Sequence, residues 1–127
     1  MNLVDSSGWV EYLTGAANAL AFQSAIEDPD ELLVPTICIA EVARAILRQS
    51  DIEAVHRALR YMHRGHVVAL DAEIAEMSAT IGREHALPLA DSIVLATARQ
   101  HRAVLWTQDA HFEHIDDVKY ARKSLDG

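Results

Sequence analysis

The opening stretch Asn2-Leu3-Val4-Asp5-Ser6-Ser7-Gly8 decides the fold class of this 127-residue chain. Its apolar first half predicts a buried strand, and the polar residues that follow predict the start of a helix. Asp5 would then lie at the carboxyl end of the strand, where either Asp5 or Ser6 could cap the helix. Because open α/β sheets bind ligands at this end of their strands, Asp5 is the first candidate site residue.

The rest of the chain alternates short apolar runs with amphipathic segments. We expect strands at 2–5, 32–34, 67–70, 103–106 and 118–121, and helices after residue 5, at 17–27, from 36, at 50–64, 71–85 and 89–101. This alternation predicts an α/β fold with three α/β/α layers and a mainly parallel central sheet. The length, with no repeat or linker, predicts a single domain over residues 1–127.

Composition narrows the expected location of the protein. Half of the residues are apolar, yet no run approaches the roughly 18 apolar residues of a membrane span. The chain begins without a basic segment followed by an apolar one, so no secretory signal is expected. The single cysteine, Cys38, lies between isoleucines and is expected to be buried. These features predict a cytoplasmic protein without membrane contact.

The formal net charge of −8 argues against broad, non-specific binding to nucleic acid. It does not exclude a nuclease, because bound metal ions offset the charge of carboxylates, and it is equally explained by solubility alone. The basic cluster from His56 to His66 could contact RNA phosphates, although a solvated helix face is the favoured interpretation. The pairs His63-x-x-His66 and His111-x-x-His114 have zinc spacing but no third ligand nearby.

Three later acids occupy positions comparable to that of Asp5. Asp91 lies near the start of a helix and Asp109 follows a strand, so each of these, like Asp5, has a local explanation as a cap or turn residue. Glu41 is different, because it lies well inside an apolar helix. A buried carboxylate is costly unless it is paired or binds a metal, and Arg44 or Arg48 could supply the pair.

Taken together, these acids predict a metal site. The carboxyl ends of parallel strands meet at one edge of a sheet, and Asp5, Asp91 and Asp109 are expected to gather there with Glu41. Mg²⁺ and Mn²⁺ prefer oxygen ligands of this kind. A metal held in this way can lower the pKa of a water molecule and stabilise charge on a phosphoryl group.

Four segments in order resemble the motifs of PIN-domain ribonucleases, and among these of VapC toxins. They are Val4-Asp5-Ser6-Ser7 with Trp9, Glu11 and Tyr12, Pro35-Thr36 through Ala40-Glu41-Val42, Leu87-Pro88-Leu89-Ala90-Asp91-Ser92 through Ala98, and Leu105-Trp106-Thr107-Gln108-Asp109-Ala110-His111-Phe112. The resemblance implies Mg²⁺- or Mn²⁺-dependent endonucleolytic cleavage of RNA, with tRNA or rRNA as substrates, at Asp5, Glu41, Asp91 and Asp109. Ser6 and Thr107 match hydroxyl positions near the metal. The resemblance also implies a homodimer and a VapB-type antitoxin.

A non-catalytic interpretation stays open beside this one. The chain could be an α/β protein-interaction module whose acids only cap helices. A nucleotide-binding fold is disfavoured, since the five glycines form neither G-x-G-x-x-G nor a P-loop. A phosphoacceptor receiver domain needs a lysine at a late strand end, and the only lysines are Lys119 and Lys123.

Overall fold

The computed structural model describes residues 1–123 and contains five strands between helices. The strands are β1 (Asn2–Val4), β2 (Leu32–Pro35), β3 (His66–Val68), β4 (Val104–Thr107) and β5 (Lys119–Tyr120). The α-helices are α1 (Ser6–Leu13), α2 (Ala19–Ile26), α3 (Thr36–Gln49), α4 (Ile52–Met62), α5 (Ala72–His85) and α6 (Leu89–Gln100), with short 3-10 turns η1 (Pro29–Glu31) and η2 (Ala110–Phe112).

The strands form one sheet in the order β3-β2-β1-β4-β5, and every neighbouring pair is parallel. The sequence predicted a mainly parallel sheet, and the α/β fold is confirmed with a wholly parallel one. The chain runs outward from β1 to β3 and then returns to β4 on the other side of β1. The winding direction therefore reverses between β1 and β4, which is where open α/β sheets form a crevice.

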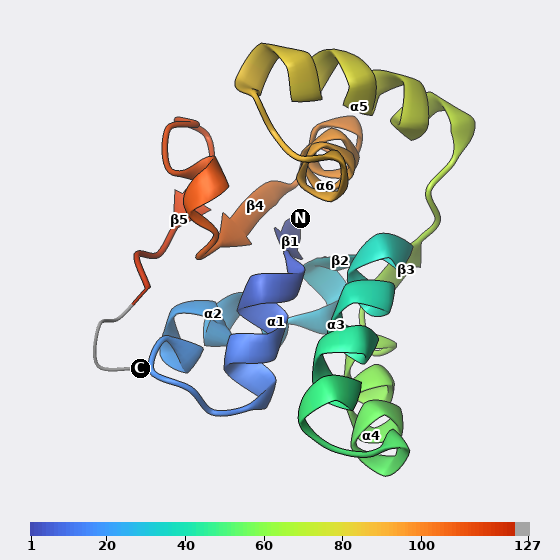
Figure 1. Ribbon diagram of the computed structural model, residues 1–127, viewed down its shortest axis with the longest axis vertical. Helices are drawn as coiled ribbons and strands as arrows, with labels where there is room; N and C mark the ends of the chain where they lie inside the picture. Colours follow the sequence, from blue (N-terminus) through green and yellow to red (C-terminus); the bar gives the residue numbers. More distant parts are fainter. Residues whose placement is uncertain (124–127) are drawn as a thin grey trace.

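Helices lie on both sides of the sheet. Figure 1 shows α5 and α6 at the top of the view, with α1, α2, α3 and α4 below the strands. The central strands are buried, as in Leu3 and Val4 of β1, and the largest buried side chains packed around them are Trp9, Phe22 and Phe112. This core explains why the strands read as continuous apolar runs rather than alternating ones.

Helix α3 is less buried than its sequence predicted. Its apolar run suggested a helix enclosed on all sides, but only Cys38, Val42 and Ile46 are buried, at a spacing of four residues. The half of the helix that carries Leu47 is exposed. One face of α3 therefore packs on the sheet. Apolar residues on the opposite face of α3 are not covered by any part of residues 1–123.

Two local predictions are corrected. The strand expected at 32–34 extends to Pro35, which is in register with Val68 of β3, because proline retains its carbonyl acceptor although it lacks the donor. Helix α4 is capped by Asp51, whose side chain accepts from the backbone N–H of Ala54 at 2.9 Å. Ser50, where the sequence predicted this helix to begin, is instead the residue that caps the carboxyl end of α3.

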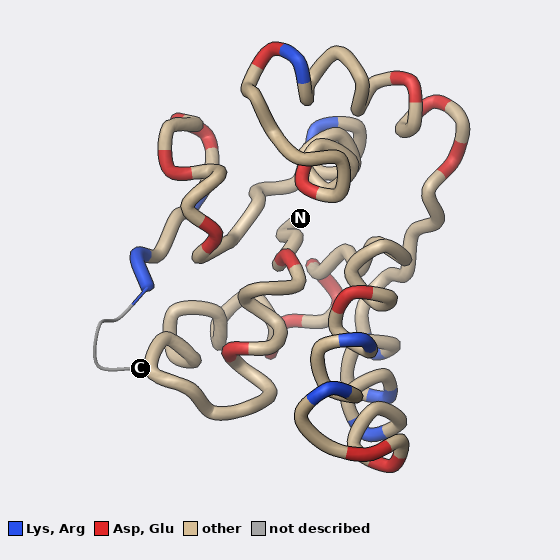
Figure 2. Tube along the Cα trace, viewed as in Figure 1, with Lys and Arg blue, Asp and Glu red and all other residues tan. Residues whose placement is uncertain are grey.

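Charge is distributed unevenly. Figure 2 shows several Lys and Arg positions along α3 and α4, whereas acidic positions are spread over the molecule, some of them near its middle where the strands end. The basic cluster from His56 to His66 is exposed at each of its charged residues. Within residues 1–123, no helix has the length and apolar character needed to cross a membrane.

Candidate active site

The four acids predicted from the sequence come from four separate elements. Asp5 directly follows β1, Glu41 lies in α3, Asp91 lies in the first turn of α6, and Asp109 is separated from the end of β4 by one residue. The charge of Asp109 raises the pKa of each of the other three, and the charge of Asp91 also raises that of Glu41, so the fold places these acids near one another.

Asp5 is the most buried of these acids, with only 4% of its surface exposed. One carboxylate oxygen accepts from the Gly8 backbone N–H at 3.0 Å, which caps α1, and from the Ser7 hydroxyl at 2.7 Å. The other accepts from the Thr107 hydroxyl at 2.5 Å. Burial raises the pKa of Asp5 to about 6, although these hydrogen bonds partly offset the rise.

Thr107 connects Asp5 to Asp109 across the reversal point of the sheet. Its side chain is fully buried at the end of β4, and its hydroxyl both donates to Asp5 and accepts from the Asp109 backbone N–H at 2.9 Å. The spacing of the two acidic segments is thus held by a hydroxyl group. A side chain of this size without an oxygen could not serve both neighbours.

Glu41 is half-buried, and in the described part of the chain it forms no ion pair with Arg44 or Arg48. Desolvation raises the pKa of Glu41, the Ser6 hydroxyl partly offsets this by hydrogen bonding, and the charges of Asp91 and Asp109 raise it further. The carboxylate therefore faces other acids rather than a cation. The paired arrangement considered from the sequence is wrong.

Asp91 has no role as a helix cap. The cap position of α6 is Pro88, and no side chain makes a capping hydrogen bond there. Burial is the main cause that raises the pKa of Asp91, followed by the charge of Asp109, while His111 lowers it. For Asp109 the local explanation does hold in part, since its side chain accepts from the His111 backbone N–H at 2.9 Å.

Two residues at this site were not identified from the sequence. His111 Nδ1 lies 2.8 Å from an oxygen of Asp91 and 3.1 Å from one of Asp109, although its sequence spacing suggested a pair with His114. His114 instead lies beside His85, with 3.2 Å between its Nε2 and the His85 carbonyl oxygen. Ser7 contacts Asp5, while Ser6 faces Glu41. The one available signal for His111 was its position two residues after Asp109.

The donor set fits a divalent cation. Atoms of Asp91, Asp109 and His111 that could bind a metal all lie within 4.8 Å of one another. Among residues 1–123, no Lys or Arg pairs with any of the four acids. Carboxylates gathered without a compensating Lys or Arg form a concentrated negative charge, which a hard cation would neutralise.

Cys38 lies close to this cluster but is chemically inert. It is fully buried, and both burial and the charges of Asp5, Glu41 and Asp91 raise the pKa of its thiol well above the usual value. The thiol stays protonated at neutral pH, so it supplies neither a nucleophile nor a metal ligand. The prediction that Cys38 is a small buried core residue is confirmed.

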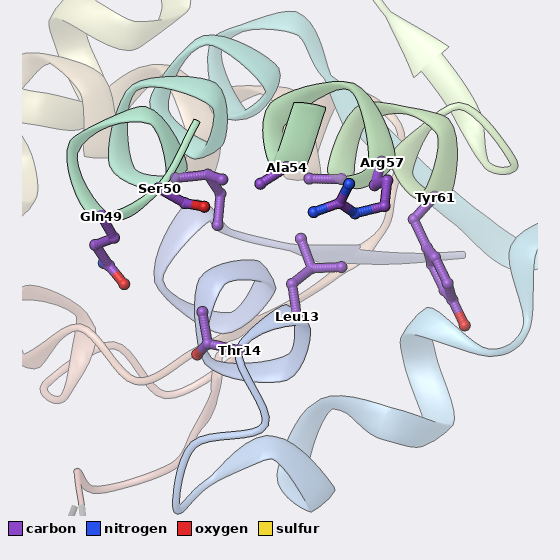
Figure 3. A pocket seen from close by; sticks show the side chains of 9 residues that line it. Leu13, Thr14, Gln49, Ser50, Ala54, Arg57 and Tyr61 are labelled. Atoms are coloured by element: carbon purple, nitrogen blue, oxygen red, sulfur yellow. The ribbon is translucent and has the colours of Figure 1, made fainter. Parts of the chain in front are cut away.

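A separate groove opens between α1, α3 and α4. It has a cavity volume of about 420 Å³ and is lined by apolar side chains such as Leu13 and Ile46, with Arg57 and Tyr61 over it (Figure 3). Tyr61 also packs against Tyr12 of α1, with 6.1 Å between ring centroids. None of the four acids lines this groove, so it is distinct from the acidic site.

Comparison with known proteins agrees with this arrangement. The family model described as the PIN domain matches residues 3–118. A search of curated proteins found no match. Among solved structures, a toxin–antitoxin complex from Klebsiella pneumoniae aligns with a TM-score of 0.78 and 25% identity, covering 93% of this chain and 95% of that one.

Two further structures share the fold at lower identity. VapC20 of Mycobacterium tuberculosis, described as a sarcin–ricin loop cleaving toxin, aligns with a TM-score of 0.76 and 17% identity over 96% of this chain and 100% of that one. DNA-bound VapBC of Salmonella typhimurium aligns with a TM-score of 0.73 and 14% identity, over 95% and 98%. With the family model matched over 116 of its positions, from 3 to 118, this chain belongs to the PIN domain family, and its fold is that of VapC proteins.

Proposed function

We propose that this chain is a metal-dependent endoribonuclease and the toxin of a VapBC-type toxin–antitoxin pair, hydrolysing phosphodiester bonds in an RNA such as tRNA or rRNA. PIN domains are nucleases, so hydrolysis is the activity that the family itself supports. The observation that carries the proposal is the convergence of Asp5, Glu41, Asp91 and Asp109 without any Lys or Arg partner in residues 1–123.

In this proposal the four carboxylates would hold Mg²⁺ or Mn²⁺. The metal would supply a water molecule of lowered pKa and stabilise negative charge on the phosphoryl group. Thr107 holds the carboxylate of Asp5 in place and fixes the backbone at Asp109. Glu41, whose pKa is raised, is suited to orient the attacking water or to complete the ligand set. The Ser6 hydroxyl would hold the Glu41 carboxylate through a hydrogen bond.

The proposed partners follow from the same comparison. Several of the structures with this fold are toxin–antitoxin complexes, which supports a VapB-type antitoxin as the partner of this chain. Exposed apolar side chains support both an antitoxin surface and a homodimer, since Leu20 is 81% exposed and Leu89 is 74% exposed. The proposed location of the protein is the cytoplasm. Light scattering of the purified chain at several concentrations tests the dimer.

The experiment that tests the activity is cleavage of total cellular RNA by the purified protein with Mn²⁺, with Mg²⁺ and with a chelator. Wild type is compared with Asp5→Asn, which keeps the oxygen that caps α1. The matched control is Asp71→Asn, because Asp71 caps α5 in the same way, accepting from the Ile74 backbone N–H at 2.8 Å.

Discrete fragments from wild type and Asp71→Asn, absent with chelator and absent for Asp5→Asn, would support the nuclease. Equal cleavage by all three proteins would show that the activity does not use this site. The alternative, a non-catalytic interaction module, requires that Glu41→Gln leave metal binding unchanged. The structure already weakens that alternative, because neither Glu41 nor Asp91 caps a helix.

A further inference from the structure

Within residues 1–123, His111 is the one residue with a side-chain nitrogen in ion-pair contact with any of the four acids, namely Asp91 and Asp109. It lies in η2, the short turn after β4, and the side chain of Asp109 holds the start of that turn through the His111 backbone N–H. Phe112, the next residue, is fully buried and anchors the turn to the core. The backbone of this turn therefore holds the imidazole of His111 next to Asp91 and Asp109.

The contacts of His111 have the geometry of a ligand set. Its Nδ1 lies 2.8 Å from the Asp91 carboxylate and 3.1 Å from the Asp109 carboxylate, and one proton on Nδ1 cannot serve both oxygens with full strength. Slightly more than half of the His111 side chain is exposed, so the ring can adjust when an ion arrives. A neutral imidazole offers a lone pair where these two carboxylates converge.

We propose that His111 is a metal ligand through Nδ1, beside Asp91 and Asp109, and that this nitrogen makes the site prefer Mn²⁺ or Co²⁺ over Mg²⁺. The inference rests on the metal dependence proposed above. Mg²⁺ selects oxygen ligands in near-ideal octahedral geometry, whereas imidazole nitrogen favours transition metals, and more strongly toward the later ones. The acids alone would not distinguish these ions in this way.

A different role for His111 makes the opposite prediction. If His111 only neutralises Asp91 and Asp109 by donating a hydrogen bond, an incoming cation must displace it. Its removal would then leave the affinity for every divalent ion unchanged or raise it. If His111 is a ligand, its removal lowers the affinity, and the loss is larger for Mn²⁺ and Co²⁺ than for Mg²⁺.

The test measures metal binding directly, without RNA. Mn²⁺, Co²⁺ and Mg²⁺ are titrated calorimetrically into full-length metal-free protein, as wild type, His111→Ala and His111→Gln. The control is His114→Ala, because His114 is an exposed histidine three residues further on that contacts the His85 carbonyl and none of the acids. Pulsed EPR of the Mn²⁺-loaded proteins reports whether a nitrogen atom is bound to the metal.

We expect nitrogen coupling in wild type and His114→Ala and none in either His111 variant. Affinity for Mn²⁺ and Co²⁺ should fall about tenfold or more in the His111 variants, the scale on which even outer-shell partners of metal ligands act. Affinity for Mg²⁺ should fall much less. Thermal unfolding in chelator confirms that each variant is folded, and His111→Gln keeps a polar side chain of similar length.

Two outcomes would overturn the proposal, and they are distinguishable. Metal binding that is lost in Asp91→Asn but unchanged in both His111 variants, without nitrogen coupling in wild type, overturns the role of His111 and leaves the proposed function intact. The absence of metal binding in wild type overturns both.

Discussion

Among single residues, the burial of Asp5 lowers the free energy of unfolding at neutral pH. Its pKa is about 6 in the folded protein against an ordinary value of 3.8, so the folded state binds the proton more tightly than the unfolded one. The stability that Asp5 contributes is therefore full below about pH 4 and is lost as the pH rises through about 6. A shift of this size corresponds to about 2–3 kcal/mol at neutral pH.

We predict that Asp5→Asn stabilises the metal-free protein at pH 7.5 by about 2–3 kcal/mol, because it removes a buried charge and keeps the cap of α1. The gain should vanish near pH 4. Urea unfolding in chelator from pH 4 to 8 measures it, with Asp71→Asn as the control for changing a capping aspartate. A loss of stability at pH 7.5 would contradict this account of Asp5.

Thr107 gives a second prediction at this scale. Thr107→Val keeps the shape of the buried side chain but leaves Asp5 and the Asp109 N–H without their shared hydroxyl. The free energy of unfolding should fall by about 1–3 kcal/mol. Thr107→Ser retains the hydroxyl and should lose less. A loss of stability in Thr107→Ser with none in Thr107→Val, measured by chemical denaturation, would mean that the methyl group rather than the hydroxyl matters.

At the scale of elements, the position of Asp91 depends on how closely α5 and α6 pack. Gly82 in α5 faces Ser92 in α6, the residue after Asp91, and a Cβ on Gly82 would lie 2.5 Å from the Ser92 Oγ. That distance is impossible without movement. A glycine in the middle of a helix thus allows the close approach, although it costs helix propensity.

We predict that Gly82→Ala destabilises the protein by about 1–2 kcal/mol, since overpacking outweighs the gain in helix propensity. Ser92→Ala removes the oxygen that alanine would meet. The loss in the double variant should therefore be smaller than the sum of the single losses by at least about 0.5 kcal/mol. Additive losses in a double-mutant cycle would show that the two positions do not share this contact.

At the scale of the whole molecule, the sheet order brings the acids together. β1 lies between β2 and β4, with Val4 in register with Trp106, so the residues that follow β1 and β4 emerge side by side. Helix α3, which follows β2, and helix α6, which precedes β4, bring Glu41 and Asp91 to the same end of the sheet. A net charge of −8 with four acids at one place opposes folding until a cation is bound.

We predict that Mn²⁺ stabilises the folded protein as a ligand would. At 100 times its dissociation constant it should add about 2.7 kcal/mol to the free energy of unfolding. Asp91→Asn should abolish most of this gain while the variant stays folded in chelator. A melting temperature that does not respond to Mn²⁺ in wild type would contradict the metal site, and an equal response in Asp91→Asn would place the ion elsewhere.

Features that depend on neighbouring residues could be predicted from the amino-acid sequence. Apolar runs located the five strands, although β3 and β5 are shorter than expected. The helix predicted at 71–85 is confirmed as α5, and its cap Asp71 acts over only three residues of sequence. Asp5 and Asp109 were located at strand ends for the same reason, because side chains next to a strand end keep that place whatever the rest of the fold does.

Only the tertiary structure decided which side chains meet. Thr107 contacts Asp5 across 102 positions of sequence, and His111 meets Asp91 only because α6 packs beside β4. The isolation of Glu41 from Arg44 and Arg48 likewise follows from the face that α3 turns toward the sheet. Local sequence patterns carry no information on such distances. The distances depend on the order of the strands in the sheet and on the packing of helices that are far apart in the sequence.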